Sequence, residues 1–317
     1  MSDDLLRLLR ATYGGQAFPA TAPFVEHFRR TGGDALLAVV LYGSRIDPSL
    51  CTETSFFDFY LICRDYASFF ARRRDRWLAR MLPPNIYYLE LPNAAGTKQV
   101  CKYCVISLAD LQDAVGARAK DLYHLGRFSK RLALLWRRDE AAGDAVLGAC
   151  RQAMLTLLPH ALGKMNDAFT LPDLVRQALA LSYEGEVRLE KTGEKVDALF
   201  HCAEDFYLEV WDRLLADYRA AHVDLFAPDD PPGVIHLRAR PTPPGLATPR
   251  LLARSRRRAK ARWPKNILLV DNWVDILLDK VERTYGVKLN LTPRERRWAL
   301  ILGWKHFFRL RREGKIR

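Results

Sequence analysis

The sequence predicts an α+β protein in which a mixed sheet with covering helices is followed by a mostly helical second domain and a basic helical C-terminal region. Short apolar runs rich in β-branched and aromatic residues recur up to Ser107, as is typical of buried strands. From Leu108 to about Ala221 the apolar residues recur at helical spacing instead, with no strand-like run. Basic residues gather at the end of the chain, beyond a stretch rich in proline.

The first domain is expected to span residues 1–115. Its strands are expected where apolar runs are bounded by turn-forming residues, at 35–42, 55–63, 85–91 and 100–107. Helical stretches are expected between and around them, at 4–11, 23–31 and 67–81. A helical second domain is expected to follow over residues 116–222.

Residues 223–250 are expected to form a linker. Seven of the chain's 17 prolines lie between residues 227 and 250, and proline has no N–H for a strand ladder. Residues 251–317 are expected to be helical. Apolar residues at spacings of three and four form a stripe from Ile267 to Val281, and Thr292-Pro293 is a start signal for a helix that runs to Arg312.

The composition indicates a soluble globular chain. Of its 317 residues, 49% are apolar and 27% are charged, which leaves room for one large domain or two ordinary ones. No run reaches the roughly 18 uncharged apolar residues that a membrane-spanning helix needs. The start Met1-Ser2-Asp3-Asp4 is acidic, whereas signal and transit peptides are basic. We therefore expect a cytoplasmic protein without a signal or transit peptide.

The cysteines do not indicate a metal site. Six are scattered along the chain, and only Cys101 and Cys104 lie close together in sequence. A zinc site needs a second such pair or two suitably spaced histidines, which the sequence lacks. Reduced, mostly buried thiols are expected.

The net charge of +13 is located entirely at the end of the chain. Residues 250–317 hold 20 Lys and Arg against 6 Asp and Glu, whereas residues 1–249 hold 30 against 31. A neutral body with a cationic end predicts a polyanionic partner, which is either a nucleic acid or an acidic lipid surface.

The sharpest local signal is a Gly-Ser turn followed by a carboxylate in an apolar strand. The run Leu41-Tyr42-Gly43-Ser44-Arg45 ends one predicted strand, and Asp58 lies inside the next. Exposed N–H groups and a hydroxyl at such a turn can cradle a triphosphate. A carboxylate in an apolar strand is costly unless it is paired or holds a cation. This pattern resembles the nucleotidyltransferase fold related to polymerase β, in which Gly-Ser binds phosphates and a strand carboxylate holds Mg²⁺.

The second carboxylate of that superfamily is absent from its usual place. The common signature is Asp-x-Asp, and here Tyr60 occupies the second position. A single carboxylate holds Mg²⁺ weakly. A further ligand is expected from Glu53, from Glu90 or from the nucleotide phosphates.

Three further segments, at 102–107 (KYCVIS), 122–130 (LYHLGRFSK) and 181–188 (LSYEGEVR), follow the Gly-Ser turn and Asp58 in order. Their order, spacing and residue types resemble the mitochondrial-type phosphatidate cytidylyltransferases, which make CDP-diacylglycerol. The resemblance spans roughly residues 40–215. Cys104 stands where that family has Gly, Arg131 where it has Pro, and Glu186 where it has Asp.

The resemblance implies roles for particular residues of this chain. It implies that Asp58 holds Mg²⁺, and that Asp58, Lys102, Lys130 and Glu186 form the catalytic group. The helical domain would contribute Tyr183, Glu186 and Arg188 to the site. The residues expected to bind the nucleotide are Gly43, Ser44, Arg45, Tyr103, Arg127, Tyr183 and Arg188.

The chemistry of such a reaction suits these residue types. A phosphate oxygen of the acceptor attacks the α-phosphorus of the nucleotide and pyrophosphate leaves, and the barrier falls mainly through positioning and charge neutralisation. A phosphomonoester is already anionic near neutral pH. No strong general base is therefore required, and no catalytic histidine is expected.

The end of the chain predicts a membrane-docking region over residues 251–317. Trp298, Trp304, Phe307 and Phe308 lie between two arginine clusters, which is the composition of an amphipathic helix on an anionic leaflet. The resulting hypothesis is a CTP:phosphatidate cytidylyltransferase bound to the inner face of the membrane. Two alternatives remain: a nucleotidyltransferase with another acceptor (RNA, protein or a small molecule), and a nucleic-acid-binding protein that uses the basic region.

Overall fold

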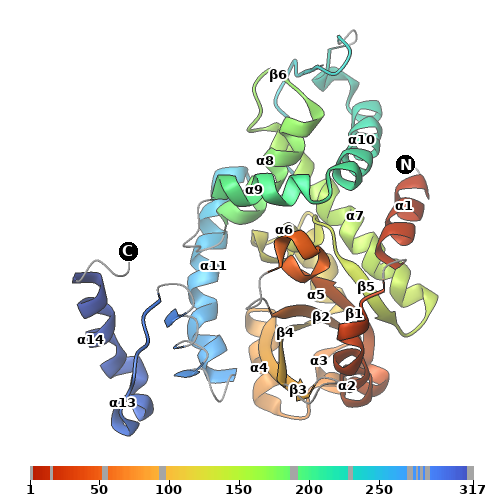
Figure 1. The fold of residues 1–317 in the computed structure, drawn as a ribbon. Coiled ribbons are helices and arrows are strands. Elements are labelled where there is room, and N and C mark those ends of the chain that lie inside the picture. Colours follow the sequence, from red (N-terminus) through yellow and green to blue (C-terminus); the bar gives the residue numbers. More distant parts are fainter. Residues whose placement is uncertain are drawn as a thin grey trace. The chain divides into compact units, whose positions relative to one another are not determined.

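The computed structural model describes residues 3–14, 17–51, 56–92, 98–185, 192–227, 231–269, 274–275, 278, 281–282 and 286–312. The chain divides into two compact units, Met1–Asn266 and Ile267–Arg317. The first unit contains the sheet and the helices around it (Figure 1).

The centre of the first unit is a five-stranded mixed sheet in the order β3-β4-β2-β1-β5. The β2–β4 pair is parallel, and the other neighbours are antiparallel. The strands are β1 (Leu36–Tyr42), β2 (Phe57–Cys63), β3 (Asn85–Pro92), β4 (Lys98–Ser107) and β5 (Ala133–Arg137). The mixed sheet confirms the predicted α+β class with a nucleotidyltransferase-like core.

The expectation that no strand lies between Leu108 and about Ala221 is wrong. β5 (Ala133–Arg137) pairs antiparallel with β1 at the edge of the sheet, and β6 (Ala168–Phe169) pairs with β7 (Ile235–His236) in a second, two-stranded sheet. Both segments are short, so their strand conformation depends on a partner that lies far away in sequence. The sheet therefore extends beyond residue 115, where the first domain was expected to end.

Both faces of the central strands are covered, which explains why β1 reads as a continuous apolar run. On one face, Phe24 and Phe28 of α2 (Ala22–Gly32) contact Phe59 of β2 at ring-centre distances of 5.7 and 5.4 Å. On the other face, Phe128 of α6 (Leu122–Phe128) contacts Tyr60 of β2 at 5.0 Å. Successive residues of β2 therefore face different helices.

Several helices of the sheet region begin at side-chain caps. Ser107 accepts a hydrogen bond from a backbone N–H of α5 (Leu108–Val115), and Asp121 and Asp139 do the same for α6 and α7 (Glu140–Leu162). The other helices of this region are α1 (Asp3–Gly14), α3 (Tyr66–Phe69) and α4 (Arg73–Met81).

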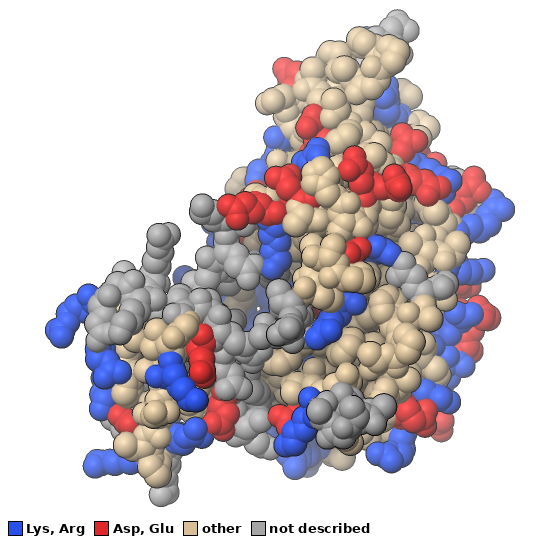
Figure 2. All heavy atoms as spheres, in the orientation of Figure 1, with Lys and Arg blue, Asp and Glu red and all other residues tan. Residues whose placement is uncertain are grey.

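The helical part that follows packs onto α6 and α7. It consists of α8 (Leu171–Glu184), α9 (Thr192–His201) and α10 (Glu204–Ala221). A Cβ on Gly126 of α6 would lie 2.8 Å from the Ser182 Cβ of α8, so these two helices approach as closely as only glycine allows. Figure 2 shows acidic side chains gathered over this part of the visible surface.

The expected linker and the start of the basic region belong to the first unit. β7 lies inside residues 223–250, and α11 (Thr248–Leu269) continues with a buried face that includes Ser255, Arg262 and Lys265. The compact unit ends at Asn266 rather than at residue 250. Part of the basic charge therefore lies in the interior of the first unit.

In the second unit the structure describes α13 (Pro293–Arg297) and α14 (Ala299–Arg312). Thr292 caps α13 in a reciprocal capping box with Glu295, which confirms the predicted helix start. The expected single helix is interrupted at Trp298. Much of the expected 267–281 stripe lies outside the described residues. No helix in the described part of the chain is both long and apolar enough to span a bilayer.

Candidate active site

The Gly-Ser turn lies directly against the carboxylate of Asp58. Gly43 follows β1 with φ 87° and ψ −163°, and the antiparallel register pairs Tyr42 with Asp58. A Cβ on Gly43 would lie 3.0 Å from Asp58 Oδ2. Glycine is therefore required both for the backbone conformation and for the close approach.

Lys102 neutralises Asp58. The parallel register of β2 and β4 places the two residues side by side, and Lys102 Nζ lies 2.5 Å from Asp58 Oδ1. The two side chains are 27% and 23% exposed, so each is partly within reach of a ligand, although Asp58 Oδ1 itself is buried. Burial opposes the charged form of Lys102, but the carboxylate of Asp58 outweighs this effect and raises the pKa of Lys102.

A layer of tyrosines lies beneath this pair, on the same face of the sheet. Tyr42 Oη lies 3.5 Å from Cys104 Sγ, which lies 3.7 Å from Tyr123 Oη. Tyr60 Oη lies 3.2 Å from His124 Nδ1. Burial raises the pKa of Tyr60 and lowers the pKa of His124 to about 3. The side chains of Tyr60 and His124 are therefore uncharged at neutral pH.

Two predicted cations come from α6 and the turn that follows it. Arg127 donates a hydrogen bond of 2.7 Å to the carbonyl of Tyr123, and its guanidinium lies 3.7 Å from the centre of the Tyr123 ring. The same guanidinium is 5.9 Å from the ring of Tyr42, beside the Gly-Ser turn. Lys130 Nζ lies 4.2 Å from the ring of Tyr183 on α8. Lys130 and Tyr183, which both belong to the part of the chain predicted as the helical domain, thus lie together.

Two residues predicted to bind the nucleotide, Tyr103 and Arg45, do not lie beside Asp58 and Lys102. Tyr103 alternates with Lys102 along β4, so it faces α2 and packs against Phe28 at a ring distance of 5.0 Å. Arg45 lies over the ring of Phe57, at 4.9 Å, and Phe57 points to the opposite face from Asp58.

The remaining predicted residues are either paired elsewhere or not described. Glu90 lies on β3, two strands from β2, and forms an ion pair of 3.5 Å with Lys98. Glu53, Glu186 and Arg188 lie outside the described residues.

A second ion pair, between Asp47 and Arg131, lies close to the turn and was not predicted. Asp47, three residues after Ser44, lies 3.5 Å from Arg131, and both side chains are about one-fifth exposed. In the family resemblance, Arg131 stands where the family has proline. Asp47 also accepts a hydrogen bond from the backbone of Ser49. No sequence signal connects the two residues, because their contact depends on how the turn after α6 approaches the turn after β1.

Asp58 fits the role of one Mg²⁺ ligand. Its Oδ2 faces the exposed glycine turn, where a nucleotide phosphate can approach, and carboxylate oxygen suits a hard cation. The described residues contain no group of three or more Asp, Glu, His or Cys side chains that could enclose a metal. Mg²⁺ often keeps several waters and binds through one or two carboxylates plus substrate phosphates, which is compatible with a lone Asp58.

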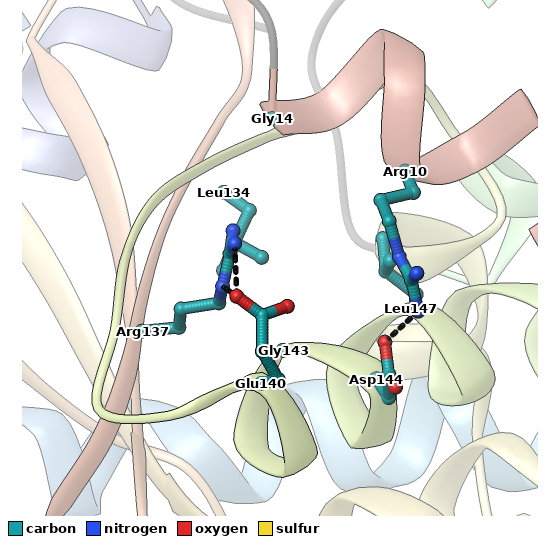
Figure 3. Close-up of a pocket in the computed structure, with 8 residues that line it drawn as sticks. All are labelled: Arg10, Gly14, Leu134, Arg137, Glu140, Gly143, Asp144 and Leu147. Carbon is teal, nitrogen blue, oxygen red and sulfur yellow. Dashed lines mark hydrogen bonds and ion pairs between the residues drawn. The ribbon is translucent and has the colours of Figure 1, made fainter. Parts of the chain in front are cut away.

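A separate hollow between α1, β5 and α7 is not a candidate site (Figure 3). It contains two arginines, but Arg137 pairs with Glu140 at 2.6 Å and Arg10 pairs with Asp144. Because both positive charges are matched by carboxylates, the hollow offers little attraction for a phosphate.

A mixed sheet that presents a Gly-Ser turn beside a strand carboxylate defines the class of protein as a nucleotidyltransferase. Residues 65–226, just over half of the chain, match the family model described as "Phosphatidate cytidylyltransferase, mitochondrial". The chain therefore belongs to this family, as the resemblance implied. No curated protein matches the chain. The match begins after Asp58, so the assignment of Gly43, Ser44 and Asp58 depends on the geometry described above.

Proposed function

We propose that this protein is a Mg²⁺-dependent CTP:phosphatidate cytidylyltransferase that acts at an anionic membrane surface. Family membership implies CTP and phosphatidate as substrates. The observation that carries the proposed site is the Asp58–Lys102 ion pair held against the Gly43 turn. At this place a ligand could contact the exposed backbone of the Gly43 turn and, beside it, one negative and one positive side chain.

In the proposed reaction, a phosphate oxygen of phosphatidate attacks the α-phosphorus of CTP. A new P–O–P bond forms, the bond to the β-phosphate breaks, and pyrophosphate leaves with its electron pair. The acceptor phosphate is already anionic, so no side chain has to remove a proton. The chain's task is to orient two anionic substrates and to offset their charge.

The residues divide this task by position. The exposed backbone around Gly43 and the Ser44 hydroxyl would hold phosphate oxygens, while Arg127 and Lys130 would offset the negative charge that pyrophosphate carries away. Lys102 holds the Asp58 carboxylate in place through the ion pair. When bound, Mg²⁺ would offset phosphate charge, with Asp58 as its protein ligand.

Membrane docking is proposed for the second unit, and with it a cytoplasmic protein attached to the inner face of the membrane. Trp298 is 53% exposed and Phe308 is 59% exposed, although large aromatic side chains are usually buried. Figure 2 shows Lys and Arg side chains on the visible surface of this unit. Exposed aromatics beside basic residues suit an anionic lipid interface.

The test is to incubate the purified protein with phosphatidate vesicles, Mg²⁺ and each nucleoside triphosphate in turn. CDP-diacylglycerol should form with CTP and should not form when EDTA is present. Asp58→Asn should reduce product formation about a hundredfold or more, whereas Asp144→Asn, a surface variant whose partner is Arg10, should not.

Two outcomes would overturn parts of the proposal. Transfer of the nucleotide to RNA or to a small molecule would identify a different acceptor. Salt-sensitive binding to RNA, with no nucleotide transfer and no preference for anionic vesicles, would favour a nucleic-acid-binding protein instead.

A further inference from the structure

Helix α11 supplies hydrogen-bond partners to the first turn of α6. Ser255 Oγ of α11 accepts the backbone N–H of Leu122 at 3.1 Å. Asp121 Oδ1 accepts the backbone N–H of Tyr123 at 2.9 Å, and Asp121 Oδ2 is bound by Arg258 at 2.5 Å and by Arg262 at 2.7 Å. The N-terminus of α6 is therefore capped jointly by Asp121 and by residues of α11 that lie more than 130 positions later in the chain.

This cluster is buried, so its members depend on each other. Asp121, Ser255 and Arg262 are 5%, 1% and 3% exposed. A buried charge without a partner is strongly unfavourable. Burial alone would raise the pKa of Asp121, but Arg262 and Arg258 lower it to about 2. The carboxylate thus remains charged and keeps both arginines in place.

The cluster continues to the proposed nucleotide site through Tyr123. The guanidinium of Arg262 lies 4.4 Å from the centre of the Tyr123 ring, and that of Arg127 lies 3.7 Å from it. Arg127 also donates a hydrogen bond to the carbonyl of Tyr123. The position of Arg127 therefore depends on Tyr123, which in turn depends on Asp121 and Arg262.

The other end of this stretch of α11 is attached to the turn between α4 and β3. Lys265 Nζ donates hydrogen bonds to the carbonyls of Leu82 at 2.5 Å and Pro84 at 2.6 Å. Arg262 Nε lies 3.3 Å from the carbonyl of Pro83. With contacts on both sides, α11 cannot shift freely relative to the sheet and α6.

We propose that Asp121, Arg258 and Arg262 are positioning residues of the nucleotide site: they fix the start of α6 and the Tyr123 ring, and thereby the guanidinium of Arg127. The inference rests on the proposed function, because it takes Arg127 as a phosphate-binding group. It also gives two basic residues of the C-terminal region a role inside the first unit, away from any lipid surface.

The test compares three variants on α11, assayed with water-soluble short-chain phosphatidate and without vesicles. Arg262→Lys keeps the charge but loses the planar guanidinium on Tyr123, and Arg258→Met removes one partner of Asp121. Arg257→Met is the control, because Arg257 is exposed on the same helix and its replacement removes one positive charge, as Arg258→Met does. Hydrogen exchange of the α6 backbone is measured in each protein.

Arg262→Lys and Arg258→Met should raise the KM for CTP about tenfold, a change that a smaller folded fraction would not produce. Exchange at the start of α6 should be faster in both. Arg257→Met should remain within twofold of the wild type. An unchanged KM in the first two variants, or an equal effect of Arg257→Met, would overturn the positioning role.

Calorimetric binding of CTP separates this inference from the proposed function. If the wild type binds CTP but does not transfer it to phosphatidate, the proposed acceptor is wrong, and the dissociation constants of the variants for CTP decide the positioning role. If the wild type does not bind CTP, both proposals fail.

Discussion

Replacing Gly43 with alanine would perturb the turn and the Asp58 carboxylate together. The φ of 87° and ψ of −163° lie in a region that is essentially restricted to glycine, and other residues there cost about 1–3 kcal/mol. The added Cβ would lie 3.0 Å from Asp58 Oδ2 and 3.6 Å from Asp58 Cβ. Either the turn or the carboxylate must therefore move by a few tenths of an ångström.

We expect Gly43→Ala to lower both stability and activity. The free energy of unfolding, measured by urea denaturation, should fall by about 1–3 kcal/mol from the backbone conformation alone. The kcat/KM for CTP should fall about tenfold to a hundredfold, because small misplacements of reacting groups are costly. CDP-diacylglycerol formation under conditions where the variant is fully folded gives this second quantity.

Gly233→Ala is the matched control. Gly233 has φ 80°, and a Cβ there would meet no atom within 4 Å, so its replacement has a backbone cost without disturbing Asp58. If Gly43→Ala retained the activity of Gly233→Ala, the turn next to Asp58 would not be part of the site.

Four further outcomes are expected. Asp58→Asn should reduce turnover about a hundredfold or more without unfolding the protein, since it removes the proposed metal ligand; a folded, active variant would place the metal elsewhere. Ser44→Ala should raise the KM for CTP only about fivefold, which corresponds to one hydrogen bond of about 1 kcal/mol, as steady-state kinetics would show. Burial lowers the pKa of His160 to about 4, so as the pH falls the unfolded state binds a proton at this histidine before the folded state does. The free energy of unfolding should therefore decrease as the pH is lowered from about 6.5 to about 4, by at most about 1.4 kcal/mol per pH unit. Denaturation of His160→Gln should show a weaker dependence of this free energy on pH. Replacing Trp298 and Phe308 with alanine should weaken binding to anionic vesicles about tenfold or more even at low salt, and unchanged vesicle cosedimentation would refute docking through these side chains.

The strands show which parts of the sheet the local sequence can predict and which depend on contacts between distant residues. All four strands predicted in the first 107 residues are present, because each has an apolar run bounded by turn residues. β5 was not predicted. Its five residues adopt strand structure by pairing with β1, about 95 residues earlier in the chain, and no local pattern encodes such a partner.

For the C-terminal basic residues, the sequence predicted where the charge lies along the chain but not which cations are buried. Counting Lys and Arg placed the excess charge correctly at the end of the chain, but a count does not distinguish exposed from buried cations. Arg258 and Arg262 are bound by Asp121, and Lys265 is bound by backbone carbonyls. Asp121 could be recognised from the sequence as a helix cap, whereas its arginine partners could not.

The sequence by itself determined the α+β class, the family and the Gly43–Asp58 motif, because these depend on residue types at short, ordered spacings. Only the tertiary structure decided that Lys102 pairs with Asp58, that Tyr103 faces the opposite side of the sheet, and that α11 caps α6. The physical reason is that strand register and helix packing set which side chains meet across the fold. Both are properties of the whole fold, and the free energy of the entire buried core selects them.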